Sequence, residues 1–188
     1  MSKLFYIIGA SGAGKDSVMN YCREQINGEL PVVFAHRYIT RPANAGGENH
    51  VSLSRLEFEL RLQHGLFAMH WESHGLYYGI GIEINNWLQN GLTVVINGSR
   101  EYLPIAMEKY PAIQPVLIDA DTDLIKNRLN NRAREDEEAI AKRLQRNEEL
   151  NLQDTSITRI QNNGAIEDAA NQLLSLMLPT EKLIDTDR

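Results

Sequence analysis

Continuous apolar runs alternate along most of the chain with amphipathic stretches of helical period. The apolar runs predict strands over residues 3–8, 31–35, 66–71, 76–80, 92–96, 114–118 and 156–160. The amphipathic stretches predict helices over residues 15–27, 54–63, 82–90, 101–110, 121–129, 140–150 and 165–178. Strands that alternate with helices favour a largely parallel sheet with helices on both faces. The pattern therefore predicts an α/β protein of three layers around a central parallel sheet.

Local signals refine this pattern at two places. Ser54 and Glu57 have the spacing of a capping box, which predicts that a helix begins there. The polar segment over residues 36–50 has neither period, and we expect it to be irregular, with a turn at Gly46-Gly47.

The stretch Gly-Ala-Ser-Gly-Ala-Gly-Lys directly follows the first predicted strand. It fits the phosphate-binding loop G-x-x-x-x-G-K-[ST] except at the last position, which is Asp16. Glycines let consecutive backbone amides turn toward a polyphosphate, and the following helix adds the positive end of its dipole. We therefore expect a nucleoside triphosphate to bind here, with Lys15 at the β- and γ-phosphates. The residues expected to bind it are Gly9, Ala10, Ser11, Gly12, Ala13, Gly14, Lys15, Asp16 and Ser17.

Composition limits the other possibilities. The net charge of −6 argues against broad binding of nucleic acid or of an anionic membrane, and no apolar run has the length of a membrane span. The single cysteine, Cys22, excludes an internal disulfide, and in the first predicted helix its expected role is packing. We expect a cytoplasmic protein that acts as a monomer or a homodimer.

Two sections depart from plain alternation of strands and helices. They are residues 36–80 and the arginine-rich section 128–146. In a phosphate-binding α/β protein, such sections suit an acceptor-binding insertion and a lid. We expect one domain over residues 1–188, with the acceptor region at about 36–80 and the lid at about 132–139. Its core is expected to consist of residues 1–35, 81–131 and 140–178.

Four short motifs, in their order and spacing, give the chain a family resemblance. They are Tyr38-Ile39-Thr40-Arg41-Pro42, Glu48-Asn49-His50, Tyr77-Tyr78-Gly79 and Arg128-Leu129-x-x-Arg132. With the phosphate loop, they resemble the guanylate kinase-like branch of the P-loop nucleotide kinases over nearly the whole chain. The resemblance implies a P-loop kinase fold and phosphoryl transfer from ATP. Non-catalytic modules of this branch typically lose the phosphate loop, which this chain keeps.

The departures from that family concern the acceptor. Counted back from Tyr77-Tyr78-Gly79, the family's guanine-reading glutamate falls at Met69 and its guanine-reading Ser or Thr at Ile80. Neither side chain can hydrogen-bond the amide edge of guanine, so we expect guanine preference to be lost. The second arginine of the family's acceptor loop is Asn44 here, and the acidic end of the fourth strand is Asn97.

Longer stretches point to a particular acceptor. Residues 14–17, 35–41, 48–50, 75–79 and 97–100 resemble members of the branch that convert ribose 1,5-bisphosphate and ATP to 5-phosphoribosyl 1-pyrophosphate (PRPP) and ADP. A sugar bisphosphate has two phosphates and no base, so it requires several donors and cations. The expected substrate-binding residues are Arg37, Arg41, His50, Tyr78 and Arg100. The alternative is a guanylate kinase or another nucleoside monophosphate kinase.

The chemistry needs charge neutralisation more than a base, because the acceptor is already an anionic phosphate oxygen. Mg²⁺ is the expected cofactor, and either Asp16 or Ser17 could hold it. The expected catalytic residues are Lys15, Arg132 and Arg143, with Arg128 at ATP. The arginines of this section, Arg134 included, could instead form a solvated helix paired with its acidic residues.

Overall fold

The computed structural model describes residues 2–26, 28, 30–45, 48, 50–131, 145 and 156–178. The expected lid, about 132–139, lies outside these residues, as does nearly all of the helix predicted over 140–150. None of the helices within the described ranges is long and apolar enough to cross a membrane.

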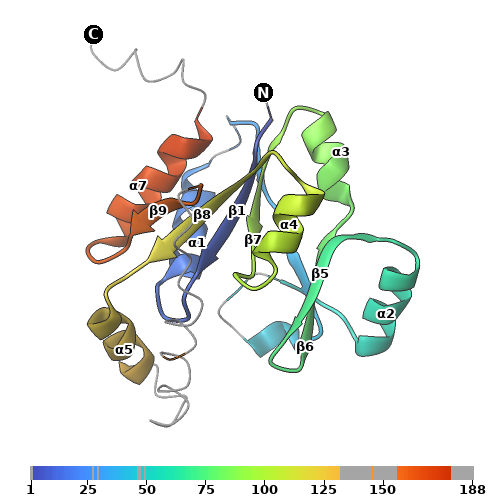
Figure 1. Ribbon diagram of the computed structural model, residues 1–188, viewed down its shortest axis with the longest axis horizontal. Helices are drawn as coiled ribbons and strands as arrows, with labels where there is room; N and C mark the ends of the chain where they lie inside the picture. Colours follow the sequence, from blue (N-terminus) through green and yellow to red (C-terminus); the bar gives the residue numbers. More distant parts are fainter. Residues whose placement is uncertain are drawn as a thin grey trace.

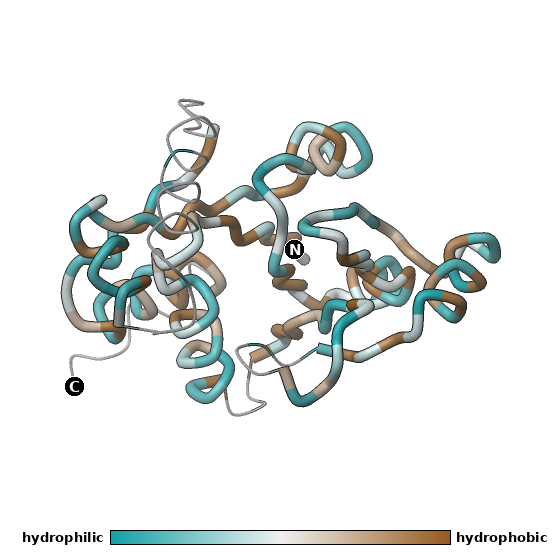
Figure 2. The backbone as a smooth tube through the Cα atoms, turned by 90° about the horizontal axis from the view of Figure 1, so that it is seen from below, coloured by the Kyte–Doolittle hydropathy of each residue, from teal (hydrophilic) through white to brown (hydrophobic). Residues whose placement is uncertain are grey.

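A five-stranded sheet forms the centre of the molecule (Figure 1). Its strands lie in the order β2 (Val32–Phe34), β7 (Thr93–Asn97), β1 (Leu4–Gly9), β8 (Ile113–Asp119) and β9 (Thr158–Gln161). All neighbouring pairs are parallel. Buried apolar residues dominate its inner strands because helices cover both faces, and Figure 2 shows these hydrophobic strands in the interior. The predicted central parallel sheet is confirmed.

Helices on the two faces of this sheet complete three layers. Helices α1 (Lys15–Gln25) and α7 (Ile166–Met177) pack on one face, where Phe5 and Ile7 meet Cys22 and Leu173. Helices α3 (Glu83–Gln89) and α4 (Leu103–Lys109) pack on the other face, around Tyr6. Cys22 is fully buried, and burial raises the pKa of its thiol to about 12, as expected of a packing residue.

A second, smaller sheet lies beside the first (Figure 1). It has the order β4 (Val51–Ser52), β3 (Arg37–Ile39), β6 (Leu76–Gly81) and β5 (Phe67–Ser73). Helix α2 (Arg55–Gln63) packs on it through Phe58, which stacks on Phe67. The Ser54 hydroxyl accepts from the Glu57 N–H at 3.1 Å, which confirms the predicted cap.

The prediction that residues 36–50 are irregular is wrong at β3. Arg37 pairs with Ile80, and Ile39 pairs with Tyr78, in an antiparallel ladder. A three-residue strand is too short to show a period, and its partner lies about 40 residues further along the chain. The rest of the segment contains a 3₁₀ turn over Ala43–Ala45. Helix α5 (Thr122–Asn131), the last described element before β9, occupies the predicted position.

Gly98 directly follows β7, at the carboxyl end of the central sheet. Substitution of this glycine tests the packing there. A Cβ at this position would lie 2.2 Å from the Tyr6 ring. The ring cannot retreat easily, because the Tyr6 hydroxyl bonds both the carbonyl and the N–H of Ser99, at 3.1 and 3.0 Å. We expect Gly98→Ala to lower the free energy of unfolding by about 2 kcal/mol, measured by urea denaturation.

Gly164→Ala is the matched control, because among the described residues its Cβ would meet only Asp168, at 3.7 Å. We expect its denaturation midpoint to stay at the wild-type value. Equal midpoints for the two variants would contradict the close packing of Tyr6 under Gly98.

Candidate active site

The phosphate loop joins β1 to α1 at the carboxyl end of the central sheet, where parallel α/β proteins bind ligands. The expected ATP-binding residues 9–17 form this loop and the first turn of α1. Gly12 and Gly14 have φ values of +90° and +86°, which only glycine adopts at little cost. The Ala13 N–H donates to the Ala10 carbonyl at 3.1 Å and closes a turn within the loop.

Helix α5 supports this loop from outside. A Cβ on Gly12 would come within 3.1 Å of Ile125 and Leu129, so the helix packs directly on the glycine. From the same helix, Nη1 of Arg128 lies 3.3 Å from the Ala13 carbonyl oxygen. The structure therefore brings the predicted Arg128 to the phosphate loop, although 115 residues separate it from Ala13.

A hydrogen-bonded network joins Lys15, Asp16 and Asn97. The Lys15 ammonium donates to Asp16 Oδ1 at 2.8 Å and to Asn97 Oδ1 at 2.5 Å. The Asn97 amide in turn donates to Asp16 Oδ1 at 2.9 Å. Ser17, the alternative metal ligand, is exposed one position further along α1.

Burial and charge act in opposite directions on this network. Burial lowers the pKa of Lys15, and the neighbouring Asp16 carboxylate opposes part of that shift. Burial also disfavours ionised Asp16, but the Lys15 ammonium and its hydrogen bond outweigh burial and lower the pKa of the carboxyl. Lys15 and Asp16 thus form an ion pair with an Nζ–Oδ1 distance of 2.8 Å, and the pair offers a cation for phosphate and a carboxylate for a divalent cation.

Among the predicted acceptor residues, Arg37 is held by Glu48 and Tyr78. Nε and Nη2 of Arg37 donate to the two carboxylate oxygens of Glu48, and the guanidinium lies 5.0 Å from the centre of the Tyr78 ring. Burial alone would lower the pKa of Arg37, but Glu48 outweighs it and raises that pKa. The Asn97 amide also reaches Glu48 Oε1, at 3.4 Å, and so connects the donor and acceptor sides.

Arg41 and His50 lie beside this pair. Arg41 Nη2 is 3.3 Å from His50 Nδ1 and 3.8 Å from Glu48 Oε2. Within the described residues, the buried Nε of Arg41 has no hydrogen-bond partner. The structure thus brings together Arg37, Arg41, His50 and Tyr78, four of the five predicted acceptor residues.

Arg100, the fifth predicted acceptor residue, comes from another part of the chain. Arg100 is half-buried in the turn between β7 and α4, and its carbonyl accepts from the Leu103 N–H at 3.3 Å. Arg132, Arg134 and Arg143 lie outside the described residues.

Apolar side chains pack behind the predicted acceptor residues. Met69 and Ile80 pair across β5 and β6, and both are fully buried in the same core cluster as Ile84. Trp71 stacks on Tyr78 with a ring separation of 5.6 Å and an interplanar angle of 2°. The two positions where guanine would be read are therefore part of the hydrophobic core.

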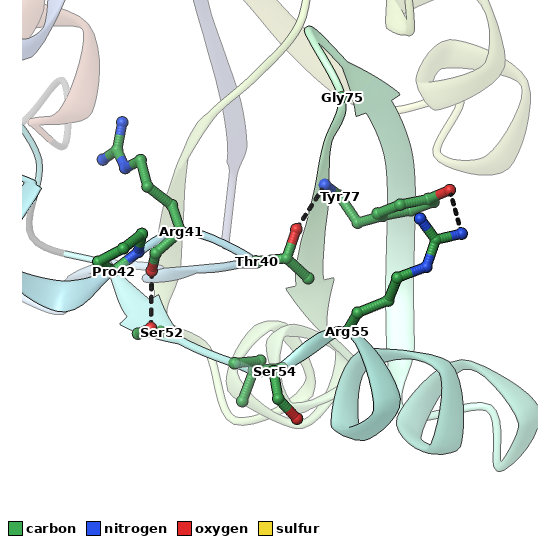
Figure 3. Close-up of a pocket in the computed structure, with 9 residues that line it drawn as sticks. Thr40, Arg41, Pro42, Ser52, Ser54, Arg55, Gly75 and Tyr77 are labelled. Carbon is green, nitrogen blue, oxygen red and sulfur yellow. Dashed lines mark hydrogen bonds between the residues drawn. The ribbon is translucent and has the colours of Figure 1, made fainter.

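A pocket of about 440 Å³ lies at the end of the smaller sheet (Figure 3). Arg55 donates to the Tyr77 hydroxyl there at 2.8 Å, and Thr40 Oγ1 accepts from the Tyr77 N–H at 2.9 Å. Figure 3 shows the Arg41 guanidinium pointing away from Tyr77 and Arg55. Arg41 also lines this pocket, so the pocket adjoins the group formed by Arg41, His50 and Glu48.

Sequence reasoning missed three residues of the site as candidate functional groups. The sequence shows Asn97 and Glu48 only as parts of family motifs, and nothing in it singles out Asn162, whose amide donates to the Ala13 carbonyl of the phosphate loop. The available signal for Asn97 is a polar side chain at the carboxyl end of an apolar strand, where ligands bind. Glu48 and Asn162 have no local signal, because Glu48 meets Arg37 and Asn97 across 11 and 49 residues and Asn162 meets Ala13 across 149 residues.

Comparison with known proteins identifies the class and then the family. The fold is similar to a crystal structure of guanylate kinase from Anaplasma phagocytophilum, with a TM-score of 0.66 and 19% identity, covering 95% of this chain and 88% of that one. This likeness shows that the chain has a guanylate kinase-like fold, with the phosphate loop at the end of its first strand. No protein-family model matches the sequence.

Two proteins named ribose 1,5-bisphosphate phosphokinase PhnN are much more similar in sequence. The one from Desulfomicrobium baculatum is 52% identical over 180 residues, 96% of each chain. The one from Thiobacillus denitrificans is 49% identical over 175 residues, 93% of this chain and 92% of that one. The chain therefore belongs to the ribose 1,5-bisphosphate phosphokinase family.

The pair formed by Arg37 and Glu48 gives a test of the site's architecture. Their side chains are only 13% and 11% exposed. We expect Glu48→Gln to lower the free energy of unfolding by about 3 kcal/mol in urea denaturation, because it leaves a buried guanidinium without its counter-charge. Glu59→Gln is the matched control, since Glu59 pairs with Arg55 on the surface and should contribute less than about 0.5 kcal/mol. Equal losses would contradict the special role of Glu48.

Proposed function

We propose that the protein transfers the γ-phosphoryl group of ATP to ribose 1,5-bisphosphate and so produces PRPP and ADP. The observation that carries this proposal is the amide of Asn97, which joins Lys15 of the phosphate loop to the pair formed by Glu48 and Arg37. Cations for a donor polyphosphate and for an acceptor phosphate thus share one site. The protein's membership of the ribose 1,5-bisphosphate phosphokinase family supports the same acceptor.

The acceptor cations support an anionic substrate without a base. A buried donor with no partner, such as Nε of Arg41, is costly, and a phosphate oxygen would satisfy it. Arg37, His50 and Tyr78 belong to the same group of side chains as Arg41. They could contact the other phosphate or the sugar. The acceptor phosphate is already anionic, so the reaction needs orientation and no proton acceptor.

Mg²⁺ fits the donor side of the site. Asp16 offers a carboxylate oxygen, the type of ligand that Mg²⁺ prefers, and it lies beside the lysine that would bind the same phosphates. Among the described residues, no three acidic, histidine or cysteine side chains form a metal-binding cluster. Water and phosphate oxygens would therefore complete the coordination, as is usual for Mg²⁺ in kinases. When bound, the ion neutralises charge on the β- and γ-phosphates.

The remaining roles follow from charge. Lys15 would stabilise the transferring phosphoryl group, and Arg128 would support the loop that holds ATP. Arg132 and Arg143, from the section that resembles the lid, would supply further positive charge in the transition state. The alternative function, a nucleoside monophosphate kinase, lacks support in the apolar surroundings of Met69 and Ile80.

A comparison of acceptors tests this function. We expect ribose 1,5-bisphosphate to be phosphorylated with a kcat/KM at least about 10³-fold above that for GMP, because the polar partners of guanine are missing. The assay couples ADP release to a reporter, and Lys15→Ala, expected to lose about 10²-fold in kcat, controls for a contaminating kinase. Comparable efficiency with GMP would overturn the proposal in favour of a guanylate kinase.

Substitution of Asp16 tests the metal ligand. If its carboxylate holds Mg²⁺, Asp16→Ala should raise the Mg²⁺ concentration needed for half-maximal activity about tenfold, and Asp16→Ser should restore part of the loss. Ser17→Ala is the matched control and should keep the wild-type magnesium dependence. A raised requirement in Ser17→Ala alone would assign the metal to Ser17 instead.

A further inference from the structure

Asn162 reaches the phosphate loop from the far end of the chain. It follows β9, and its side chain is almost completely buried. Its Nδ2 donates to the Ala13 carbonyl at 2.7 Å, across a separation of 149 residues. Its backbone N–H donates to the Asp119 carbonyl at 2.7 Å, which anchors the residue at the end of β8. The amide is therefore held rigidly against the loop.

Arg128, from helix α5, binds the same carbonyl oxygen. Its Nη1 lies 3.3 Å from the Ala13 oxygen, and its Nη2 donates to the Asn162 carbonyl at 2.9 Å. Two donors from two elements thus converge on one carbonyl oxygen and are also joined to each other. We call Asn162 and Arg128 together the Ala13 clamp.

The clamp determines which way one peptide group of the loop faces. The Ala13 carbonyl and the Gly14 N–H belong to the same planar trans peptide and point in opposite directions. Because the clamp holds the carbonyl on the outside of the loop, the N–H faces the inside, where phosphate would bind. Gly14 has a left-handed φ of +86° and is conformationally permissive, so this peptide could flip without the clamp.

We propose that Asn162 is a positioning residue for phosphate binding, which acts by fixing the orientation of the peptide between Ala13 and Gly14. The inference rests on the proposed binding of ATP at this loop. Gly14 is then required for a second reason besides its left-handed φ. A Cβ there would lie 2.4 Å from Asn162 Nδ2 and displace the Asn162 side chain. The phosphate loop of this protein thus depends on a residue after the last strand of the sheet.

The chain offers a closely matched pair of substitutions. Only the donor end of the Asn162 amide is used, since Oδ1 is buried without a hydrogen-bond partner in the described part of the chain. Asn162→Asp removes that donor and places an oxygen against the Ala13 carbonyl. Asn163→Asp adds the same charge one position later, but Asn163 Oδ1 already accepts from the Asp121 N–H at 2.8 Å, and a carboxylate can accept the same bond.

Calorimetric titration of the full chain with Mg²⁺–ATP and with Mg²⁺–tripolyphosphate tests the proposal. We expect Asn162→Asp to raise the Kd of both ligands by the same factor, about tenfold, because the loop binds the phosphates that they share. Asn163→Asp should keep the wild-type Kd for both. In steady-state assays, the KM for ATP should rise while the KM for the acceptor stays unchanged.

Other results would overturn the proposal in distinct ways. Weaker binding of ATP alone would show that Asn162 acts on the nucleoside, and equal effects of the two aspartates would reduce its role to general charge. If circular dichroism shows that Asn162→Asp does not fold, Asn162→Ala removes the donor without a buried charge and carries the same expectation. Wild-type protein that binds neither ligand would overturn the proposed function itself.

Discussion

The parallel pairing of β1 with β7 brings the two halves of the site together. In this register Asn97 lies beside Ile7, two residues before the phosphate loop begins. The side chain of Asn97 can therefore accept a hydrogen bond from Lys15 and donate to Asp16 and Glu48. An amide suits this position because it offers an acceptor to the cation and a donor to the carboxylates. An aspartate there would place a third negative charge beside two others and repel them.

The core behind the predicted acceptor residues has apolar side chains at the two positions where the family resemblance places guanine recognition. Met69 and Ile80 are fully buried between the two sheets, and Trp71 and Tyr78 stack in front of them. A site that recognises a base needs polar groups in its wall. A site without those groups discriminates strongly against that base. Arg37 and Arg41 lie around Glu48 in front of this apolar wall.

The likeness to guanylate kinase and the membership of the phosphokinase family describe different levels of this molecule. The guanylate kinase structure shares the fold at 19% identity, and a fold of this type carries many functions. The relatives at about half identity show the family to which the chain belongs.

The sequence by itself determined the elements whose signal is local. The inner strands are continuous apolar runs, the glycines and lysine of the phosphate loop have fixed spacing, and Ser54 caps α2 as predicted. These features depend on residues a few positions apart, so their physical cause is visible in a short window of sequence.

Only the tertiary structure decided the contacts between distant segments. Strand β3 forms because β6 offers it a partner, although the sequence there shows no period. Arg37 pairs with Glu48, and Arg128 and Asn162 meet at Ala13, because the sheets bring their elements to one edge. Charged and amide side chains are compatible with many surroundings, and hydrogen bonding selects among them only after packing has placed the backbone. The site was therefore predictable in its loop and its cations, and unpredictable in the groups that hold them.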